Sequence, residues 1–267
     1  GDNIRPRGND FRAGHRIEAP RLLDPQDIAL LASMNIATVP VTRRPRVALI
    51  STGDELVMPG ETPGPDQIIA SNTLGLHALL RDLGAEPRLL PIARDTADSL
   101  SMVFDLVDDA DLVITIGGAS VGDHDIVAQM AQTLGLERAF YKVAMRPGKP
   151  LMSGRLGRAV MIGLPGNAVS AMVCGHVFVA PVVRAMLGLG AAAAPRALLP
   201  LAAPVDINGP REHYMRACSG PSGATIFERQ DSALLSVLGA ADLLVVRPPN
   251  DPARAAGDLV ETLRLRR

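Results

Sequence analysis

The chain has 267 residues, 47% of them hydrophobic and 21% charged, so it can bury one sizeable core together with a smaller domain. Its net charge of −1 and aromatic content of 3%, without tryptophan, argue against binding to nucleic acid or to a membrane surface. Cys174 and Cys218 fit neither a metal-ligand spacing nor a disulfide framework, and no apolar run reaches membrane-spanning length. These features predict a protein of the reducing cytoplasm, without a nucleic-acid or membrane partner.

The first 44 residues predict an extended segment followed by a helix. Residues 1–20 are rich in arginine, glycine and asparagine and show no apolar periodicity. Asp24 followed by Pro25 is typical of a helix start, because aspartate can cap the helix and proline is favoured at its first position. We expect this segment to bury no core of its own.

Residues 45–190 alternate between apolar runs and helical patterns. The runs predict strands at residues 46–50, 87–92, 112–116, 139–144 and 159–162, and the patterns predict helices at 72–83, 99–107, 126–134 and 169–187. This alternation predicts an α/β fold with a doubly wound, mostly parallel sheet. Because such sheets bind ligands at the carboxyl ends of their strands, we expect the functional site in the loops that follow the strands.

The C-terminal part has a different pattern. After an Ala/Pro linker at residues 191–195, residues 196–267 contain short apolar runs separated by proline, glycine and aspartate. No long helical period interrupts them. We therefore predict a small C-terminal β-barrel or sandwich domain over residues 196–267.

A glycine-rich turn at residues 115–125, Thr-Ile-Gly-Gly-Ala-Ser-Val-Gly-Asp-His-Asp, lies between a predicted strand and a predicted helix. A strand, a glycine turn and a helix N-terminus in this order direct backbone N–H groups toward an anion such as phosphate. Ser120, Asp123 and Asp125 would repel a bare phosphate, which suggests a divalent cation between phosphate and protein. A tight turn with an aspartate helix cap is the purely structural alternative.

Carboxylates follow the first two predicted strands. Asp54 and Glu55 come after Gly53 at the end of the first strand, and Asp95 follows the second strand. A carboxylate in this place can hold a metal ion or a sugar hydroxyl, and it can equally serve as an ordinary turn or cap residue.

A basic loop and a second glycine loop complete the same edge of the sheet. Lys142, Arg146 and Lys149 surround a rigid Pro-Gly turn and offer permanent cations for phosphate. Residues 163–167, Gly-Leu-Pro-Gly-Asn, offer backbone amides at a helix start that Asn167 can cap. The chain contains no Walker A loop, no dinucleotide-binding G-x-G-x-x-G after its first strand and no G-x-S-x-G elbow.

In order and spacing, these motifs resemble the molybdopterin molybdenumtransferase family, which includes MoeA and the gephyrin E domain. The matching segments are residues 51–56 (Ser-Thr-Gly-Asp-Glu-Leu), 71–72 (Ser-Asn), 117–125, 146–150 (Arg-Pro-Gly-Lys-Pro) and 163–167, with further similarity at 3–14, 211–216 and 231–236. The resemblance covers essentially the whole chain but lacks the family's N-terminal portion. Arg146 stands where many members carry lysine, and Ala168 replaces a frequent proline.

The resemblance implies an enzyme of molybdenum cofactor biosynthesis that inserts molybdate into adenylated molybdopterin, releases AMP and uses Mg²⁺ or another divalent cation. It implies catalytic roles for Glu55, Asp95, Asp125, Lys142, Arg146 and Lys149, with Glu55, Asp95 and Asp125 also binding the metal. It implies that the pterin substrate is bound by Thr52, Gly53, Asp54, Ser71, Asn72, Gly117, Gly118, Ser120, Gly122, Asp123, Pro147, Gly148, Pro165, Gly166, Asn167 and Ser170. A cytoplasmic homodimer is also implied, with the molybdopterin adenylyltransferase and molybdoenzymes as further partners.

Two other functions stay open from the sequence. A molybdopterin adenylyltransferase shares the fold of the central domain, but the C-terminal β domain and the Pro-Gly-Lys-Pro loop speak against it. A non-catalytic pterin-binding module would follow if the missing N-terminal portion were essential for catalysis. The carboxylates Glu55, Asp95 and Asp125 speak against such a module, because a carrier has little need of a metal site.

Overall fold

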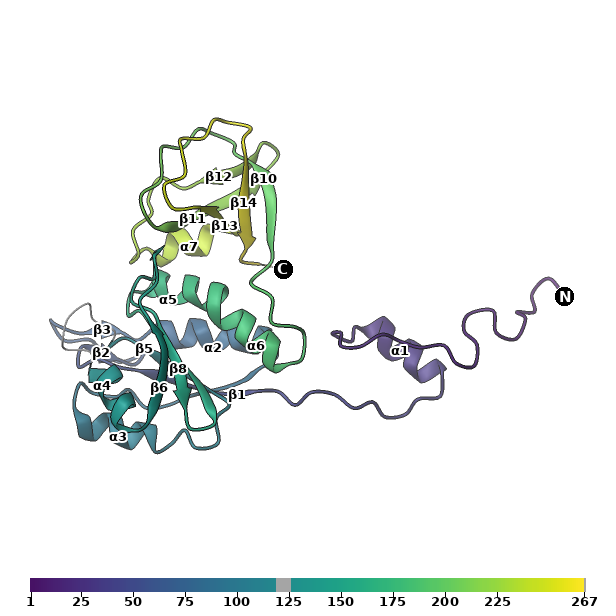
Figure 1. The fold of residues 1–267 in the computed structure, drawn as a ribbon, viewed down its shortest axis with the longest axis horizontal. Coiled ribbons are helices and arrows are strands. Elements are labelled where there is room, and N and C mark those ends of the chain that lie inside the picture. Colours follow the sequence, from purple (N-terminus) through teal and green to yellow (C-terminus); the bar gives the residue numbers. More distant parts are fainter. Residues whose placement is uncertain (119–125, 267) are drawn as a thin grey trace. The chain divides into compact units, whose positions relative to one another are not determined.

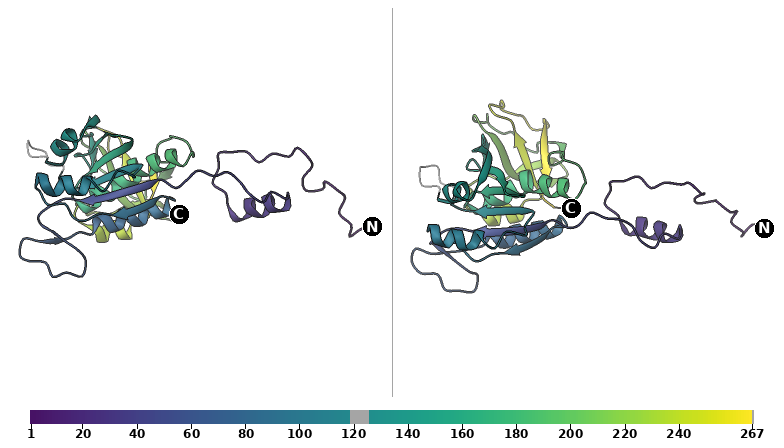
Figure 2. Two further views of the ribbon diagram at one scale, coloured as in Figure 1. Left: turned by 90° about the horizontal axis from the view of Figure 1, so that it is seen from below. Right: turned by 60° about the horizontal axis from the view of Figure 1, so that its bottom comes forward.

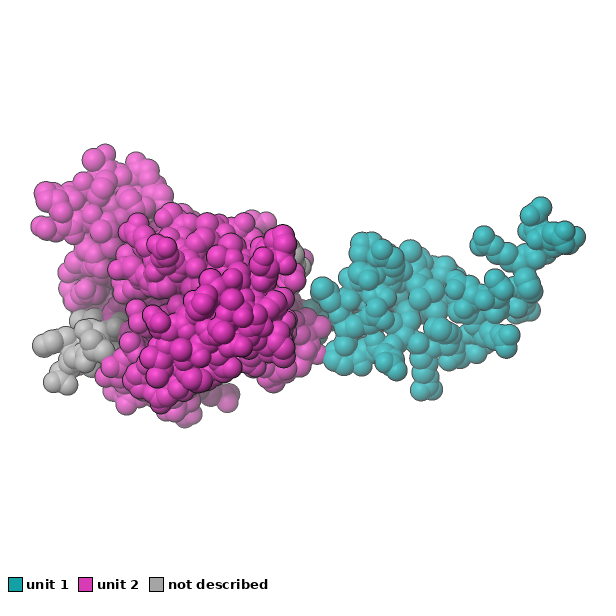
Figure 3. Space-filling model, turned by 90° about the horizontal axis from the view of Figure 1, so that it is seen from above, with its two compact units in different colours: residues 1–42 teal, residues 43–267 magenta. Residues whose placement is uncertain are grey.

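The computed structural model describes residues 1–118 and 126–266, and the chain divides into two compact units, residues 1–42 and residues 43–267 (Figure 3). The smaller unit consists of loops around one helix, α1 (Pro25–Ser33). As predicted, Asp24 caps this helix: its side chain accepts a hydrogen bond from the backbone N–H of Asp27, and the Asp27 side chain accepts one from the backbone N–H of Asp24. This reciprocal cap defines the helix start.

The larger unit contains a six-stranded main sheet in the order β4-β1-β5-β9-β8-β6. Strands β1, β5, β6 and β8 of this sheet are labelled in Figure 1. Its strands are β1 (Arg46–Ser51), β4 (Glu86–Leu89), β5 (Leu112–Ile116), β6 (Leu136–Tyr141), β8 (Met152–Leu156) and β9 (Ala159–Leu164). The first four strands of this order are parallel, while β8 runs antiparallel to both β9 and β6. The predicted α/β fold with a mostly parallel sheet is therefore confirmed.

Helices cover both faces of the main sheet because alternate residues of its central strands face opposite sides. Val47 and Leu49 of β1 pack with α2 (Asn72–Asp82), α5 (Ala168–Cys174) and the segments that continue α5. Ala48 and Ile50 face the other side and pack with α3 (Ala97–Phe104) and α4 (Ile126–Thr133). The apolar runs predicted as strands are continuous because both faces are buried.

The helix after β9 continues from α5 through one π-helical stretch, Gly175–Val179, into α6 (Ala180–Met186). By length and composition alone, the segment Ala168–Met186 could cross a membrane, so the expectation that no apolar run is this long is wrong. Within the larger unit, Val169, Val173 and Val183 on this helix are completely buried in the core against the sheet. Packing on the sheet accounts for the apolar side chains on its buried face.

The C-terminal part forms a second, mainly antiparallel sheet. Its strands are β10 (Arg196–Pro200), β11 (Glu212–Gly220), β12 (Gly223–Ile226), β13 (Leu243–Arg247) and β14 (Leu259–Arg264), in the order β10-β14-β13-β11-β12. A β-bridge between Leu201, which directly follows β10, and Ala224 of β12 links the two edge strands of this sheet. A short helix, α7 (Leu235–Ala240), precedes β13 and has no counterpart in the sequence prediction.

A short strand connects the basic loop to this second sheet. Residues Met145–Arg146 form β7, which pairs in parallel with β11. Two further short strands, β2 (Leu56–Val57) and β3 (Ile68–Ile69), pair with each other, and the loop between them extends away from the main sheet (Figure 2). None of these three strands was predicted, because two residues are too few to produce a periodic signal.

The strand directions bring the polar loops to one edge of the main sheet. The loops after β1, β4, β5 and β9 follow parallel strands and therefore leave the sheet on the same side. Because β8 is antiparallel to both of its neighbours, β6 runs in the same direction as β9, and the basic loop leaves on this side too. The carboxyl edge is thus where the candidate site lies.

Candidate functional site

A cavity of about 530 Å³ opens at the carboxyl ends of β1, β5 and β9. Its lining comes from these strand ends and from β2, β3, α2 and the C-terminal segment: Ser51, Thr52, Glu55, Leu56, Ile68, Ile69, Ala70, Ser71, Asn72, Ile116, Gly117, Gly118, Pro150, Pro165, Gly166, Asn167, Ala168 and Ala233. Nine of the substrate-binding or catalytic residues expected from the sequence lie in this lining, namely Thr52, Glu55, Ser71, Asn72, Gly117, Gly118, Pro165, Gly166 and Asn167.

The described part of the glycine turn needs both of its glycines. Gly117 and Gly118 have φ of +95° and +66°, which disfavours residues with a side chain. A Cβ on Gly117 would lie 2.5 Å from the carbonyl oxygen of Thr52, and one on Gly118 would overlap the Val127 side chain. The backbone therefore approaches β1 closely, and both glycines line the cavity.

The second glycine loop is fixed by side-chain hydrogen bonds from two asparagines. Asn72 Nδ2, at the start of α2, donates to the Gly166 carbonyl at 2.7 Å. Asn167 occupies the N-cap position of α5 but makes no side-chain cap bond; its Nδ2 donates to Ser232 Oγ at 3.2 Å. The expectation that the Asn167 side chain caps α5 is wrong, because that side chain joins the loop to the C-terminal segment instead.

Three carboxylates gather beside the cavity. The Asp95 backbone N–H donates to Asp54 Oδ1 at 3.1 Å, which draws the loop after β4 toward the loop after β1. Glu55 folds back over Gly53, where a Cβ would lie 2.5 Å from Glu55 Oε2. Partial burial, followed by the negative charges of Asp54 and Glu55, raises the pKa of Asp95. The negative charges of Asp54 and Glu55 thus contribute a repulsion that disfavours the ionised form of Asp95.

This repulsion suits a site for a divalent cation, because a cation would relieve it. Among residues 1–118 and 126–266, no three His, Cys, Asp or Glu side chains are close enough to hold a metal ion. Glu55 and Asp95 are two of the three metal ligands expected from the sequence, and the third, Asp125, lies outside the described residues. The described donors therefore fit a partial oxygen site that would need at least one further ligand.

The basic loop leaves the sheet after β6 and presents exposed cations. Lys142, Arg146 and Lys149 are all exposed, and Lys142 Nζ lies 4.8 Å from the centre of the Tyr141 ring. The loop returns on itself through hydrogen bonds from the Lys142 N–H to the Leu151 carbonyl, at 2.7 Å, and from the Val143 N–H to the Lys149 carbonyl, at 3.0 Å. These bonds fix its backbone.

Gly148 anchors the same loop to α5. Its φ is +111°, and a Cβ there would lie 2.5 Å from Cys174 Sγ and 3.2 Å from Met145 Sδ. The Cys174 thiol is fully buried, and burial raises its pKa to about 12, so it acts as a packing surface for the loop and not as a nucleophile.

Sequence reasoning did not assign a functional role to the basic side chains of β11. His213 and Arg216 are 7% and 2% exposed, and burial, with a smaller contribution from the charge of Arg146, lowers the pKa of each. Arg216 is held by Gln230 Oε1 at 3.1 Å and by the Asp231 carbonyl at 2.7 Å. The apolar run at residues 213–217 indicated this strand, and similarity to the family at residues 211–216 was the signal that pointed to a function for it.

Several expected site residues lie apart from the cavity lining. Ser170 is only 4% exposed, in the first turn of α5, and is not part of the lining. Gly53, Asp54, Asp95, Lys142, Arg146, Pro147, Gly148 and Lys149 lie in the adjoining loops without lining it. Ser120, Gly122, Asp123 and Asp125 lie outside the described residues.

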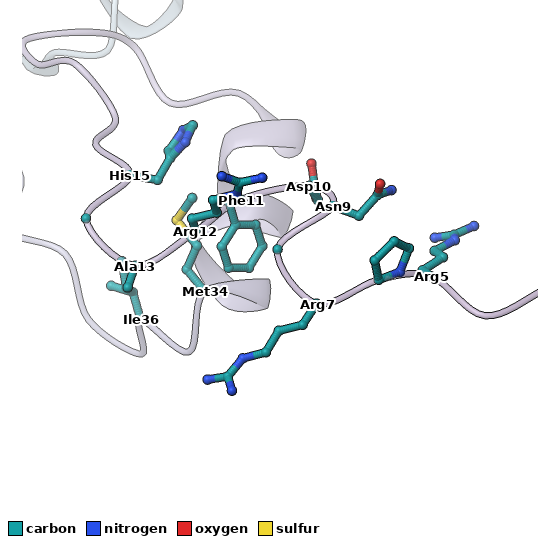
Figure 4. A pocket seen from close by; sticks show the side chains of 13 residues that line it. Arg5, Arg7, Asn9, Asp10, Phe11, Arg12, Ala13, His15, Met34 and Ile36 are labelled. Carbon is teal, nitrogen blue, oxygen red and sulfur yellow. The ribbon is translucent and has the colours of Figure 1, made fainter.

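A second pocket, of about 1060 Å³, lies within the N-terminal unit (Figure 4). It is lined by Arg5, Pro6, Arg7, Gly8, Asn9, Asp10, Phe11, Arg12, Ala13, Gly14, His15, Met34 and Ile36. Its lining includes Arg5, Gly8, Asp10 and Gly14, four of the positions that carry the family resemblance of this segment; Asn3 and Ile4 are not in the lining.

Comparisons with known proteins identify the relatives of this chain. The family model described as a probable molybdopterin binding domain matches residues 48–185, which include the glycine turn and the basic loop. A molybdopterin molybdenumtransferase from Nostoc is 40% identical over 194 residues, covering 71% of this chain and 44% of the relative. Molybdopterin molybdenumtransferase 2 from Mycobacterium tuberculosis is 38% identical over 198 residues, covering 71% of this chain and 48% of the relative. The chain thus spans less than half the length of these relatives.

A solved structure shows the same fold. The molybdopterin biosynthesis MoeA protein from Pyrococcus horikoshii superposes with a TM-score of 0.79 at 29% identity, covering 91% of this chain and 60% of that protein. The match extends beyond the family model's residues to most of the chain. The chain therefore belongs to the molybdopterin-binding domain family, as a relative of the molybdopterin molybdenumtransferases.

Proposed function

We propose that this chain carries the activity after which its relatives are named, the insertion of molybdate into adenylated molybdopterin with release of AMP. The observation that carries the proposal is one cavity whose lining contains both glycine turns and the carboxylate of Glu55, and to which the basic loop contributes Pro150. The substrate is an anion with a phosphate linkage and a polar ring system. Backbone amides, fixed cations and a partial metal site are the groups that such a substrate needs.

Each group has a specific role in this proposal. Glu55, Asp95 and Asp125 would hold Mg²⁺, which would supply charge neutralisation at the phosphates. Lys142, Arg146 and Lys149 would bind the molybdate and phosphate oxygens and would stabilise the negative charge that grows on the AMP phosphate as it leaves. The amides at Gly117, Gly118 and Gly166 would orient the pterin and the phosphates. Thr52, Ser71 and Asn72 offer hydroxyl and amide groups to the same substrate.

The names of the relatives favour the transferase over an adenylyltransferase or a carrier. In the cell, a molybdopterin adenylyltransferase would supply the substrate, and molybdoenzymes would receive the product. We propose a cytoplasmic homodimer as the working form. Two free cysteines among the described residues, Cys174 and Cys218, fit a reducing compartment.

Replacement of Glu55 tests the site directly. Glu55→Gln keeps the size of the side chain and removes its charge, so metal-dependent AMP release should fall by about 100-fold or more, a loss typical of one electrostatic group. Asp66→Asn, an exposed carboxylate in the loop between β2 and β3, is the matched control and should keep the activity. Equal activity in the two variants would remove Glu55 from the mechanism.

A further inference from the structure

Three basic side chains form one row across the second sheet and the basic loop. His213 of β11 is the register partner of Arg146 in β7 and of Arg247 in β13. Register partners on neighbouring strands project their side chains from the same face of a sheet. The row Arg146, His213, Arg247 therefore runs from the exposed basic loop into the C-terminal sheet.

The inner end of this row is fixed. Arg247 is 1% exposed, and its guanidinium donates to Asp251, to the Pro252 carbonyl at 2.7 Å and to the Asp206 carbonyl at 3.2 Å. Asp251 balances its charge and also binds Arg254 at 2.6 Å. Arg247 therefore cannot turn away from the row without breaking a buried ion pair.

The middle of the row is a buried imidazole. Burial lowers the pKa of His213 to about 4, aided by the positive charges of nearby guanidiniums on β7, on β11 and its preceding loop, and on β13. These are Arg146, Arg216, Arg211 and Arg247. At neutral pH His213 is therefore uncharged, so it adds no third positive charge between Arg146 and Arg247.

Arg146, at the outer end of the row, has a backbone fixed by strand pairing and an exposed side chain. Strand pairing sets Met145 opposite Glu212, and the Glu212 N–H donates to the Ala144 carbonyl at 2.9 Å. The Arg146 side chain is exposed. The His213 side chain, beside Arg146 in the row, limits the directions in which the Arg146 guanidinium can extend.

We propose that His213 is a positioning residue, the spacer that separates Arg146 from Arg247 and holds the Arg146 guanidinium ready for the anionic part of the substrate. The role given to the anion rests on the proposed function, whereas the row itself does not. His213 touches no substrate; it acts through Arg146.

The row can be tested by nuclear magnetic resonance on the folded wild-type chain. Titration of the His213 imidazole should give a low pKa, and Arg146→Ala, a change at an exposed side chain, should raise that pKa because one facing charge is gone. Lys149→Ala removes a cation of the same loop outside the row and should leave it unchanged. An unmoved His213 pKa in Arg146→Ala, or equal shifts in the two variants, would overturn the proposal.

The positioning role can be tested with molybdate as the probe, by calorimetric titration. His213→Gln and His213→Glu differ only in charge; the carboxylate should pair with Arg146 and weaken molybdate binding about tenfold relative to the glutamine variant. In an Arg146→Ala background the two variants should bind alike. The role of His213 would be contradicted if the two variants bound molybdate equally well with Arg146 present. It would also be contradicted if their affinities still differed by the same factor in the Arg146→Ala background.

These measurements separate the two proposals. AMP release by the wild-type chain tests the proposed function. The imidazole titration and the molybdate titration test the row, and neither requires turnover. If AMP release fails and the two titrations give the expected results, the row stands and the transferase proposal falls.

Discussion

The backbone N–H of Asp95 donates a 3.1 Å hydrogen bond to Oδ1 of Asp54, and this bond joins the loops that follow β4 and β1. It brings a carboxylate whose pKa is raised next to two others. The pKa of Asp95 is higher in the folded chain than in the unfolded chain. Stability is therefore lost as the pH rises through these two pKa values, and the loss is complete once Asp95 is ionised in the folded chain. The arrangement costs stability at neutral pH unless a cation neutralises it.

We therefore expect Asp95→Asn to raise the Tm in metal-free buffer at neutral pH. Mg²⁺ at about ten times its dissociation constant should raise the wild-type Tm by roughly 2–5 °C, since it binds the folded chain. The Asp95→Asn variant should show little of this rise, whereas Asp66→Asn should behave like the wild type. A wild-type Tm that does not respond to any divalent cation would contradict the metal site.

Gly148 offers a test of how the basic loop is attached. Gly148→Ala places a methyl group against Cys174 Sγ at a positive φ, so it should cost about 1–3 kcal/mol of unfolding free energy and weaken molybdate binding. Gly157→Ala is the control, because φ is also positive there, at +55°, but no atom lies within 4 Å of the added Cβ. If both variants lose the same stability, the contact with Cys174 has no role.

The buried pair of Arg247 and Asp251 should dominate the stability of the C-terminal sheet. Arg247→Met leaves the Asp251 carboxylate buried and should cost about 3–5 kcal/mol in urea unfolding. Arg254→Met removes the more exposed partner of the same carboxylate and should cost less than about 1 kcal/mol. Comparable losses in the two variants would contradict the importance assigned to burial.

His213 should make the fold sensitive to acid. Its pKa is about 4 in the folded chain and near 6.5 when unfolded, so the unfolded chain binds the proton first as the pH falls. Stability should therefore decrease between pH 6.5 and pH 4, with no further loss from this residue below that window. Urea unfolding across this range should show a smaller decrease in His213→Gln than in the wild type; parallel curves would refute the assignment.

The main sheet could be predicted because its strands are continuous apolar runs, as in Leu112–Ile116, where all five residues are buried. Strand β8 was missed because Gly154 and Arg155 interrupt its apolar pattern. Helix α7 has only six residues, and Gly239 lies within it. Short elements of this kind depend on tertiary contacts and leave little periodic signal.

The sequence predicted only those parts of the candidate site that follow from the parallel direction of the strands. Loops after parallel strands must meet at one edge, which is why Thr52, Gly117 and Gly166 line one cavity. The pairing of Met145–Arg146 with β11 joins segments more than 60 residues apart and has no local signature, so His213 was not recognised as a neighbour of Arg146.

The most direct test of the proposed function is the release of AMP from adenylated molybdopterin by this chain, with Mg²⁺ present and molybdate either added or omitted. We predict that AMP accumulates when molybdate is added and stays near the uncatalysed level when it is omitted. AMP release at the same rate in both conditions, or none in either, would contradict the proposed molybdate insertion.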